Sequence, residues 1–126
     1  MPPVWKHLMG IAQDEVGKTL GQLPSDLRKS AQEVPVVFEP KPNAELIADG
    51  LDADLLGLFV GESFVDMEHG TASPLPPQIL LFLENLWDFA EGDENLFREE
   101  VRITFMHELG HFLGLNEEDL EDRGLD

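Results

Sequence analysis

The amino-acid sequence predicts an α+β fold, in which a small β-sheet is flanked by an N-terminal helix and a long helix near the C-terminus. Apolar residues recur at helical spacing near both ends of the chain, whereas the middle contains short apolar segments bounded by proline, glycine and acidic residues. The chain has 126 residues and no stretch with linker composition. We therefore expect one domain over residues 1–126, since two domains would each be too small to bury a core.

The N-terminal third is expected to form two helices, a strand and a brief helical turn. Residues 3–21 form an amphipathic helix in this prediction, because apolar residues recur there at helical spacing: Val4, Leu8, Ile11, Ala12, Val16 and Leu20. Ser25 is a favourable cap for a short second helical turn. The β-branched segment 34–38 predicts a strand, and Asn43 is placed to cap one more turn, which runs through Ile47.

The middle of the chain is expected to supply the remaining strands. The apolar segment 55–60 predicts a second strand, and residues 64–67 predict a weak third. Residues 70–77 have the composition of a loop. Residues 78–83 are apolar enough for a strand buried on both faces, and a turn of helix is expected around Trp87.

The longest predicted helix begins after Asp93, a favourable N-cap, and ends at Gly114, a favourable residue for a left-handed helix end. Its core-facing stripe has spacings of four, four, four and three: Phe97, Val101, Phe105, Leu109 and Phe112. The acidic tail after Gly114 is expected to form one last turn.

The charge balance excludes several classes of protein. The chain has 26 Asp and Glu against 8 Lys and Arg, a formal net charge of -18. Such a surface repels nucleic acids and anionic membranes, so neither is expected as a partner. There is no Cys for a disulfide or a thiolate site. The longest apolar stretch is too short to cross a bilayer. The apolar segment within residues 1–11 is too short for the core of a signal peptide, so we expect a cytoplasmic protein.

The long helix contains the motif H-E-x-x-H at residues 107–111. Residues four apart differ by about 40° around a helix, so His107 and His111 are expected on one side, nearly opposite the apolar stripe. Two imidazoles in this arrangement suit a zinc ion, and Glu108 is placed to act as the base towards a bound water molecule. The alternative is an acidic helix with solvated histidines, but the motif is expected by chance in only about one of 70 chains of this composition.

A zinc site of this kind needs a third protein ligand. Three residues after Gly114 the chain has Glu117, which completes the string H-E-x-x-H-x-x-G-x-x-E and is the expected ligand. Glu118 and Asp119 are close enough in sequence to compete for this role.

The motif and several segments before it resemble the zincin metallopeptidases. Among these, the resemblance is greatest to the small bacterial minimal zincins, whose motif is similar to the Asp-zincin pattern H-E-x-x-H-x-x-G-x-x-D. The resemblance covers roughly residues 34–126 and includes the segments 55–61, 77–82 and 101–104. It implies a small mixed β-sheet backed by two helices, a zinc ion at the motif and hydrolysis of peptide bonds.

Carried over by position, the resemblance implies that His107 and His111 are zinc ligands, that Glu108 is the catalytic base, and that Glu117 takes the place of the third ligand. The chain departs from the family in three respects. It has no Met after Gly114, so the Met-turn beneath the metzincin site is absent. Glu117 is one methylene longer than the expected Asp, and the chain has no Tyr, a frequent oxyanion partner in zincins.

The expected function is that of a zinc-dependent metallopeptidase acting on a peptide or protein, which would pair with the weak strand at 64–67. The alternative is a non-catalytic, zinc-stabilised binding or regulatory module with the same fold. An open position on the metal would separate the two, because a structural zinc ion is enclosed by four protein ligands. A third hypothesis, an amidase for small molecules, would require a narrow pocket instead of a groove.

Overall fold

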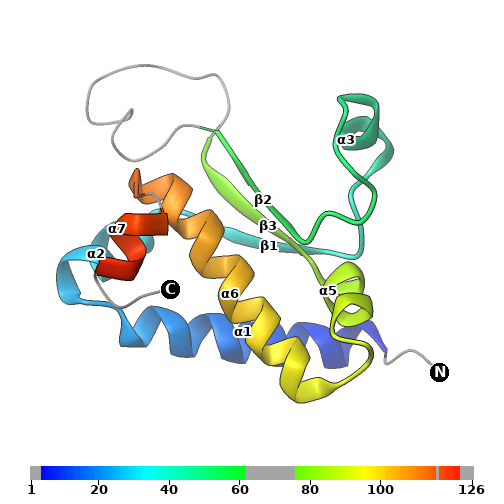
Figure 1. Cartoon of the computed structure of the whole chain (residues 1–126), viewed down its shortest axis with the longest axis horizontal. Coiled ribbons are helices and arrows are strands. Elements are labelled where there is room, and N and C mark those ends of the chain that lie inside the picture. The colour runs from blue at the N-terminus through cyan, green and yellow to red at the C-terminus, as the bar shows by residue number, and fades with distance from the viewer. Residues whose placement is uncertain (1–3, 62–75, 116, 123–126) are drawn as a thin grey trace.

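The computed structural model describes residues 4–61, 76–115 and 117–122, without the side chains of Glu117 and Leu120. The strand expected at 64–67 lies outside these residues. The helices and strands are, in chain order, α1 (Trp5–Gln22), α2 (Ser25–Ala31), β1 (Val36–Glu39), α3 (Ala44–Ala48), β2 (Gly57–Val60), β3 (Gln78–Phe82), α5 (Leu83–Phe89), α6 (Glu94–Leu113) and α7 (Glu117–Asp122) (Figure 1). The predicted α+β class is confirmed.

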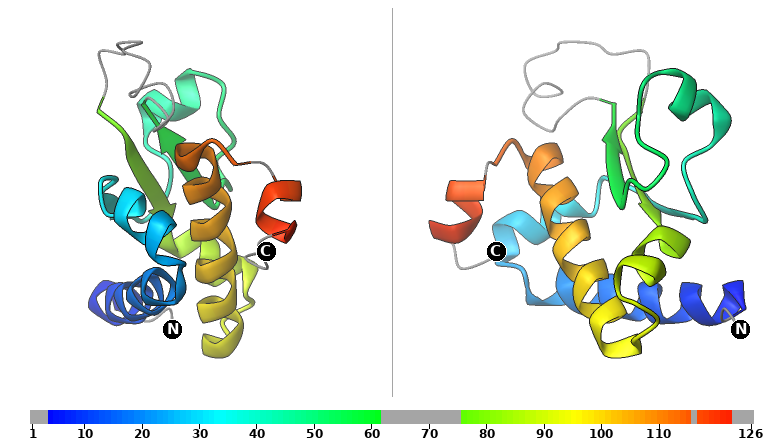
Figure 2. Two further views of the ribbon diagram at one scale, coloured as in Figure 1. Left: turned by 90° about the vertical axis from the view of Figure 1, so that its left-hand side faces the viewer. Right: turned by 45° about the vertical axis from the view of Figure 1, so that its right-hand side comes forward.

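The described strands form a three-stranded mixed sheet in the order β1-β3-β2. β1 is parallel to β3, with Val36 opposite Ile79, and β2 is antiparallel to β3, with Phe59 opposite Ile79. The strand expected to be buried on both faces is therefore the central one. The side chains of Ile79 and Leu81 on one face have no exposure to solvent, whereas Gln78 and Leu80 on the other face are partly exposed, so the expected burial is complete on one face only. Among the described strands, β2 forms the edge of the sheet that lies beside α6 (Figure 2).

α6 packs against more of the described elements than any other helix or strand does. It contacts α1, α2 and α5 as well as β2 and β3 (Figures 1 and 2). The whole predicted stripe is buried, with exposures of 0–1%: Phe97, Val101, Phe105, Leu109 and Phe112. Since burial of such large apolar side chains is the main favourable term in folding, α6 is held rigidly by the core.

Both predicted ends of α6 are confirmed. The Asp93 side chain accepts a hydrogen bond from the backbone N–H of Leu96 at 3.0 Å. Gly114 adopts a left-handed conformation with φ 75°, and the N–H of Leu115 donates to the carbonyl of Gly110 at 2.8 Å. A side chain at the position of Gly114 would be strained, so glycine allows the chain to reverse there towards α7.

The predicted strand limits are wrong by one or two residues. β1 and β2 each begin two residues later than expected, and Leu83 begins α5 instead of ending β3. At β2 the cause is the buried Asn85, whose side-chain NH₂ donates to the carbonyls of Ala53 and Leu55 at 2.8 and 2.9 Å. These bonds fix the approach to β2 in an irregular conformation.

Ion pairs connect α1 to the N-terminal half of α6. Arg98 on α6 lies 3.0 Å from Asp14 and 3.7 Å from Glu15, and Lys18 lies 3.1 Å from Asp14. Hydrogen bonds from Lys18 and then from Arg98 hold the pKa of Asp14 below its ordinary value, because both favour the charged carboxylate. Since Asp14 and Lys18 are exposed and Arg98 is only partly buried, the pairs orient the two helices more than they stabilise them.

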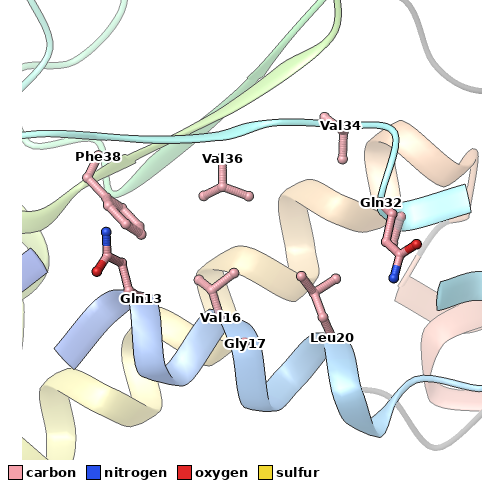
Figure 3. Close-up of a pocket in the computed structure, with 9 residues that line it drawn as sticks. Gln13, Val16, Gly17, Leu20, Gln32, Val34, Val36 and Phe38 are labelled. Atoms are coloured by element: carbon pink, nitrogen blue, oxygen red, sulfur yellow. The ribbon is translucent and has the colours of Figure 1, made fainter. Parts of the chain in front are cut away.

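A shallow pocket of about 420 Å³ lies between α1, α2 and β1 (Figure 3). It has a mostly apolar lining with an amide side chain on α1 and another after α2: Gln13, Val16, Gly17, Leu20, Ala31, Gln32, Val34, Val36 and Phe38. None of these residues belongs to the H-E-x-x-H motif, so the pocket and the motif are separate features. Among the described helices, none has the length and apolar character needed to cross a membrane.

Candidate metal centre

The motif lies in the last turns of α6, and its two histidines are on the side of the helix that faces away from the core. His107 and His111 are exposed, whereas Phe105 and Leu109 are buried. The Glu108 side chain is 12% exposed, because it is turned towards β2. The structure thus brings together the three motif residues that the sequence singles out.

The donor atoms of the three side chains lie within 4.8 Å of one another. Nε2 of His107 and Nε2 of His111 are 3.3 Å apart, and the two rings are nearly perpendicular. Oε2 of Glu108 lies 3.9 Å from Nε2 of His107. Within the described part of the chain, this is the one cluster of three or more His, Asp or Glu side chains that are close enough to share a metal ion.

The two imidazoles fit a zinc ion. Zn–N bonds are about 2.0–2.1 Å long, so two nitrogens on a tetrahedral zinc ion lie about 3.3 Å apart. The Nε2 atoms of His107 and His111 have this separation. Neutral imidazole is also the commonest zinc ligand, and the exposure of both rings leaves space for further ligands on the solvent side.

Glu108 makes a contact that the sequence analysis missed. Its Oε1 accepts a hydrogen bond from the backbone N–H of Phe59 in β2 at 3.0 Å. The Phe59 ring packs against Phe112 on α6 with a centroid distance of 5.9 Å, and the buried Gly57 lies against α6. The signal in the sequence is this isolated glycine inside a predicted strand, which often marks a close approach of two backbones.

The structure places the backbone of Glu117 at the first position of α7, which packs against α6. The side chain of Glu117 lies outside the described part of the molecule, so its role as third ligand stays a prediction. Of the two competing acids, Glu118 is exposed and Asp119 is partly buried.

The family assignment rests on more than the motif. No curated protein matches the chain. A family model described as zincin-like metallopeptidase matches residues 31–125, a region that includes β1, the rest of the described sheet, α6 and α7. This region is most of the chain and contains the His107, Glu108 and His111 cluster. The chain therefore belongs to the zincin-like metallopeptidase family.

Proposed function

We propose that this protein is a zinc-dependent peptidase, with His107 and His111 as zinc ligands and Glu108 as the catalytic base. The separation of 3.3 Å between the two Nε2 atoms is the observation that carries the proposal, because it fits two ligands of one tetrahedral zinc ion. Membership of the zincin-like metallopeptidase family supports the same reaction class.

A zinc ion bound there would supply Lewis-acid activation of a carbonyl group and of a water molecule. The protein supplies the proton transfer. Glu108 takes the proton of the attacking water molecule at Oε2, the oxygen nearer to His107. It then donates this proton to the amide nitrogen as the peptide C–N bond breaks, so the carboxylate is regenerated at the end of the cycle.

The charge of the chain bears on the choice of substrate. With a formal net charge of -18, the protein attracts neutral or basic peptides more than acidic ones, and salt should weaken this attraction. Pairing of the substrate with residues 64–67 remains a proposal, since these residues lie outside the described part of the chain.

The proposal is tested by incubating the zinc-loaded protein with a broad peptide library and identifying new termini by mass spectrometry. We expect cleavage that disappears when a chelator removes the metal and returns when zinc is restored. A protein that binds zinc but cleaves no peptide would favour the non-catalytic binding module. Cleavage of small amides without cleavage of peptides would favour the amidase.

The third ligand is tested by replacing the acids of α7 one at a time. We expect Glu117→Ala to weaken zinc affinity at least about tenfold. Loss of a residue that merely orients a metal ligand typically weakens affinity by about 10- to 100-fold, and loss of the ligand itself should cost no less. Glu118→Ala is the matched control, since Glu118 is an exposed neighbour. Isothermal titration with zinc measures both. Equal losses for Glu117→Ala, Glu118→Ala and Asp119→Ala would indicate attraction by the whole acidic tail instead of coordination.

A further inference from the structure

The two carboxylate oxygens of Glu108 face different surroundings. Oε1 accepts the hydrogen bond from the Phe59 N–H, whereas Oε2 is 3.9 Å from Nε2 of His107. With only 12% of the side chain exposed, water has little access to compete for either position. One oxygen is therefore attached to the sheet while the other is directed towards the two histidines.

The N–H of Phe59 is available because β2 is an outer strand of the sheet that the described residues form. In an antiparallel ladder, alternate residues direct their N–H and C=O groups towards the neighbouring strand. The carbonyl of Leu56 pairs with β3 through the Phe82 N–H, so Leu58 and Val60 also pair with β3 and Phe59 turns away from it. Glu108 thus uses an edge donor without taking a hydrogen bond from the sheet.

Gly57 allows α6 to approach β2 closely enough for this bond. A Cβ atom on Gly57 would lie 2.6 Å from Cγ2 of Thr104, 3.3 Å from the carbonyl oxygen of Leu80 and 3.4 Å from Cγ of Glu108. Thr104 is buried in α6, so its methyl group has little freedom to move. Any larger residue at position 57 would have to push β2 and α6 apart.

We propose that the backbone N–H of Phe59 orients the catalytic base, and that the contact of Gly57 with Thr104 sets the distance at which it does so. The inference rests on the proposed role of Glu108. Phe59 and Gly57 are positioning residues: they fix Oε1 so that Oε2 is held towards the metal site before substrate binds. Such preorganisation raises kcat more than it lowers KM, because a misdirected base still permits binding.

The test widens the gap between β2 and α6 and then restores it. Gly57→Ala adds the clashing methyl group, and Thr104→Ser removes Cγ2, the atom that the new Cβ would meet first. We expect Gly57→Ala to lower kcat about 10- to 100-fold with KM changed less than about threefold, and the double variant to recover most of kcat. Thr104→Ser alone measures the effect of losing the methyl group.

Gly10→Ala is the matched control, because Gly10 lies inside α1 and an added Cβ there would meet nothing within 4 Å. Its kcat should equal that of the original protein. Zinc affinity should be retained in every variant, since the histidines are not changed.

The second readout is the amide resonance of Phe59 in ¹⁵N NMR spectra. Because this amide donates to a carboxylate, the resonance of the Phe59 amide proton should be shifted downfield and the proton should exchange slowly with solvent in the original protein. Glu108→Ala and Gly57→Ala should both abolish this signature, while the Leu58 amide, which pairs with β3, stays as a reference. The double variant should regain it.

The outcomes separate this inference from the proposed function. A Phe59 amide that is unaffected by Glu108→Ala would overturn the contact. A Gly57→Ala variant that loses the amide signature and keeps its full kcat would overturn the positioning role. Absence of any hydrolysis in the original protein would contradict the proposed function, but the Phe59 amide would still decide whether Glu108 is oriented by β2.

Discussion

Replacement of both His107 and His111 by alanine should abolish zinc binding by this protein. The two Nε2 atoms lie 3.3 Å apart on one side of α6, so the variant loses both imidazoles of the proposed site at once. We expect zinc affinity to fall by at least about 1,000-fold, since binding through the remaining carboxylates would be weak and diffuse. Isothermal titration and metal analysis after dialysis measure the loss.

Both histidines are exposed, so the fold should survive the double replacement. Circular dichroism verifies this. His7→Ala is the control, because His7 is an exposed histidine on α1 and lies near Glu94 instead of the motif. Zinc content that is the same in the double variant and in the original protein would show that the metal binds elsewhere.

Glu108→Gln should retain zinc and lose hydrolysis. Glutamine has nearly the same shape, and its side-chain oxygen can still accept the hydrogen bond from the Phe59 N–H, so the site should keep its geometry. The amide cannot take a proton from water. Loss of a general base typically lowers kcat by about 10²- to 10⁴-fold, and we expect a reduction in this range. Initial rates on a cleaved peptide measure it.

Glu99→Gln is the control for this variant, because it makes the same chemical change at an exposed position of α6. Its rate should match that of the original protein. Equal rates for Glu108→Gln and the original protein would exclude Glu108 as the base. Loss of zinc from Glu108→Gln but not from Glu99→Gln would show that the Glu108 carboxylate holds the metal, which would contradict its role as the base.

The sequence predicts correctly those elements whose limits depend on residues within or next to the element itself. α6 is the clearest case: a stripe of apolar residues, an Asp at one end and a Gly at the other give its limits, because each of these signals acts within a few residues. The same stripe places His107 and His111 on the exposed side.

Features that depend on distant partners were not predictable in this way. The start of β2 depends on Asn85, about 30 residues away along the chain, and Glu108 bonds to a backbone group 49 residues away. A backbone N–H has no signature in a sequence, since almost every residue has one. The third ligand remains a prediction because Glu117, Glu118 and Asp119 are adjacent and all offer a carboxylate, so the sequence does not distinguish them.

The end of α6 also shapes the electric field at the histidines. Aligned peptide dipoles give a helix roughly half an elementary negative charge at its C-terminus. α6 has 20 residues, and His111 lies in its last turn, just before the reversal at Gly114. The backbone itself therefore attracts cations to this position, and it attracts a divalent ion about twice as strongly as a monovalent one. If α6 continued past Gly114, its negative end would lie farther from the imidazoles. Gly114, which ends the helix, therefore also determines how negative the electrostatic potential is where the two imidazoles would bind a cation.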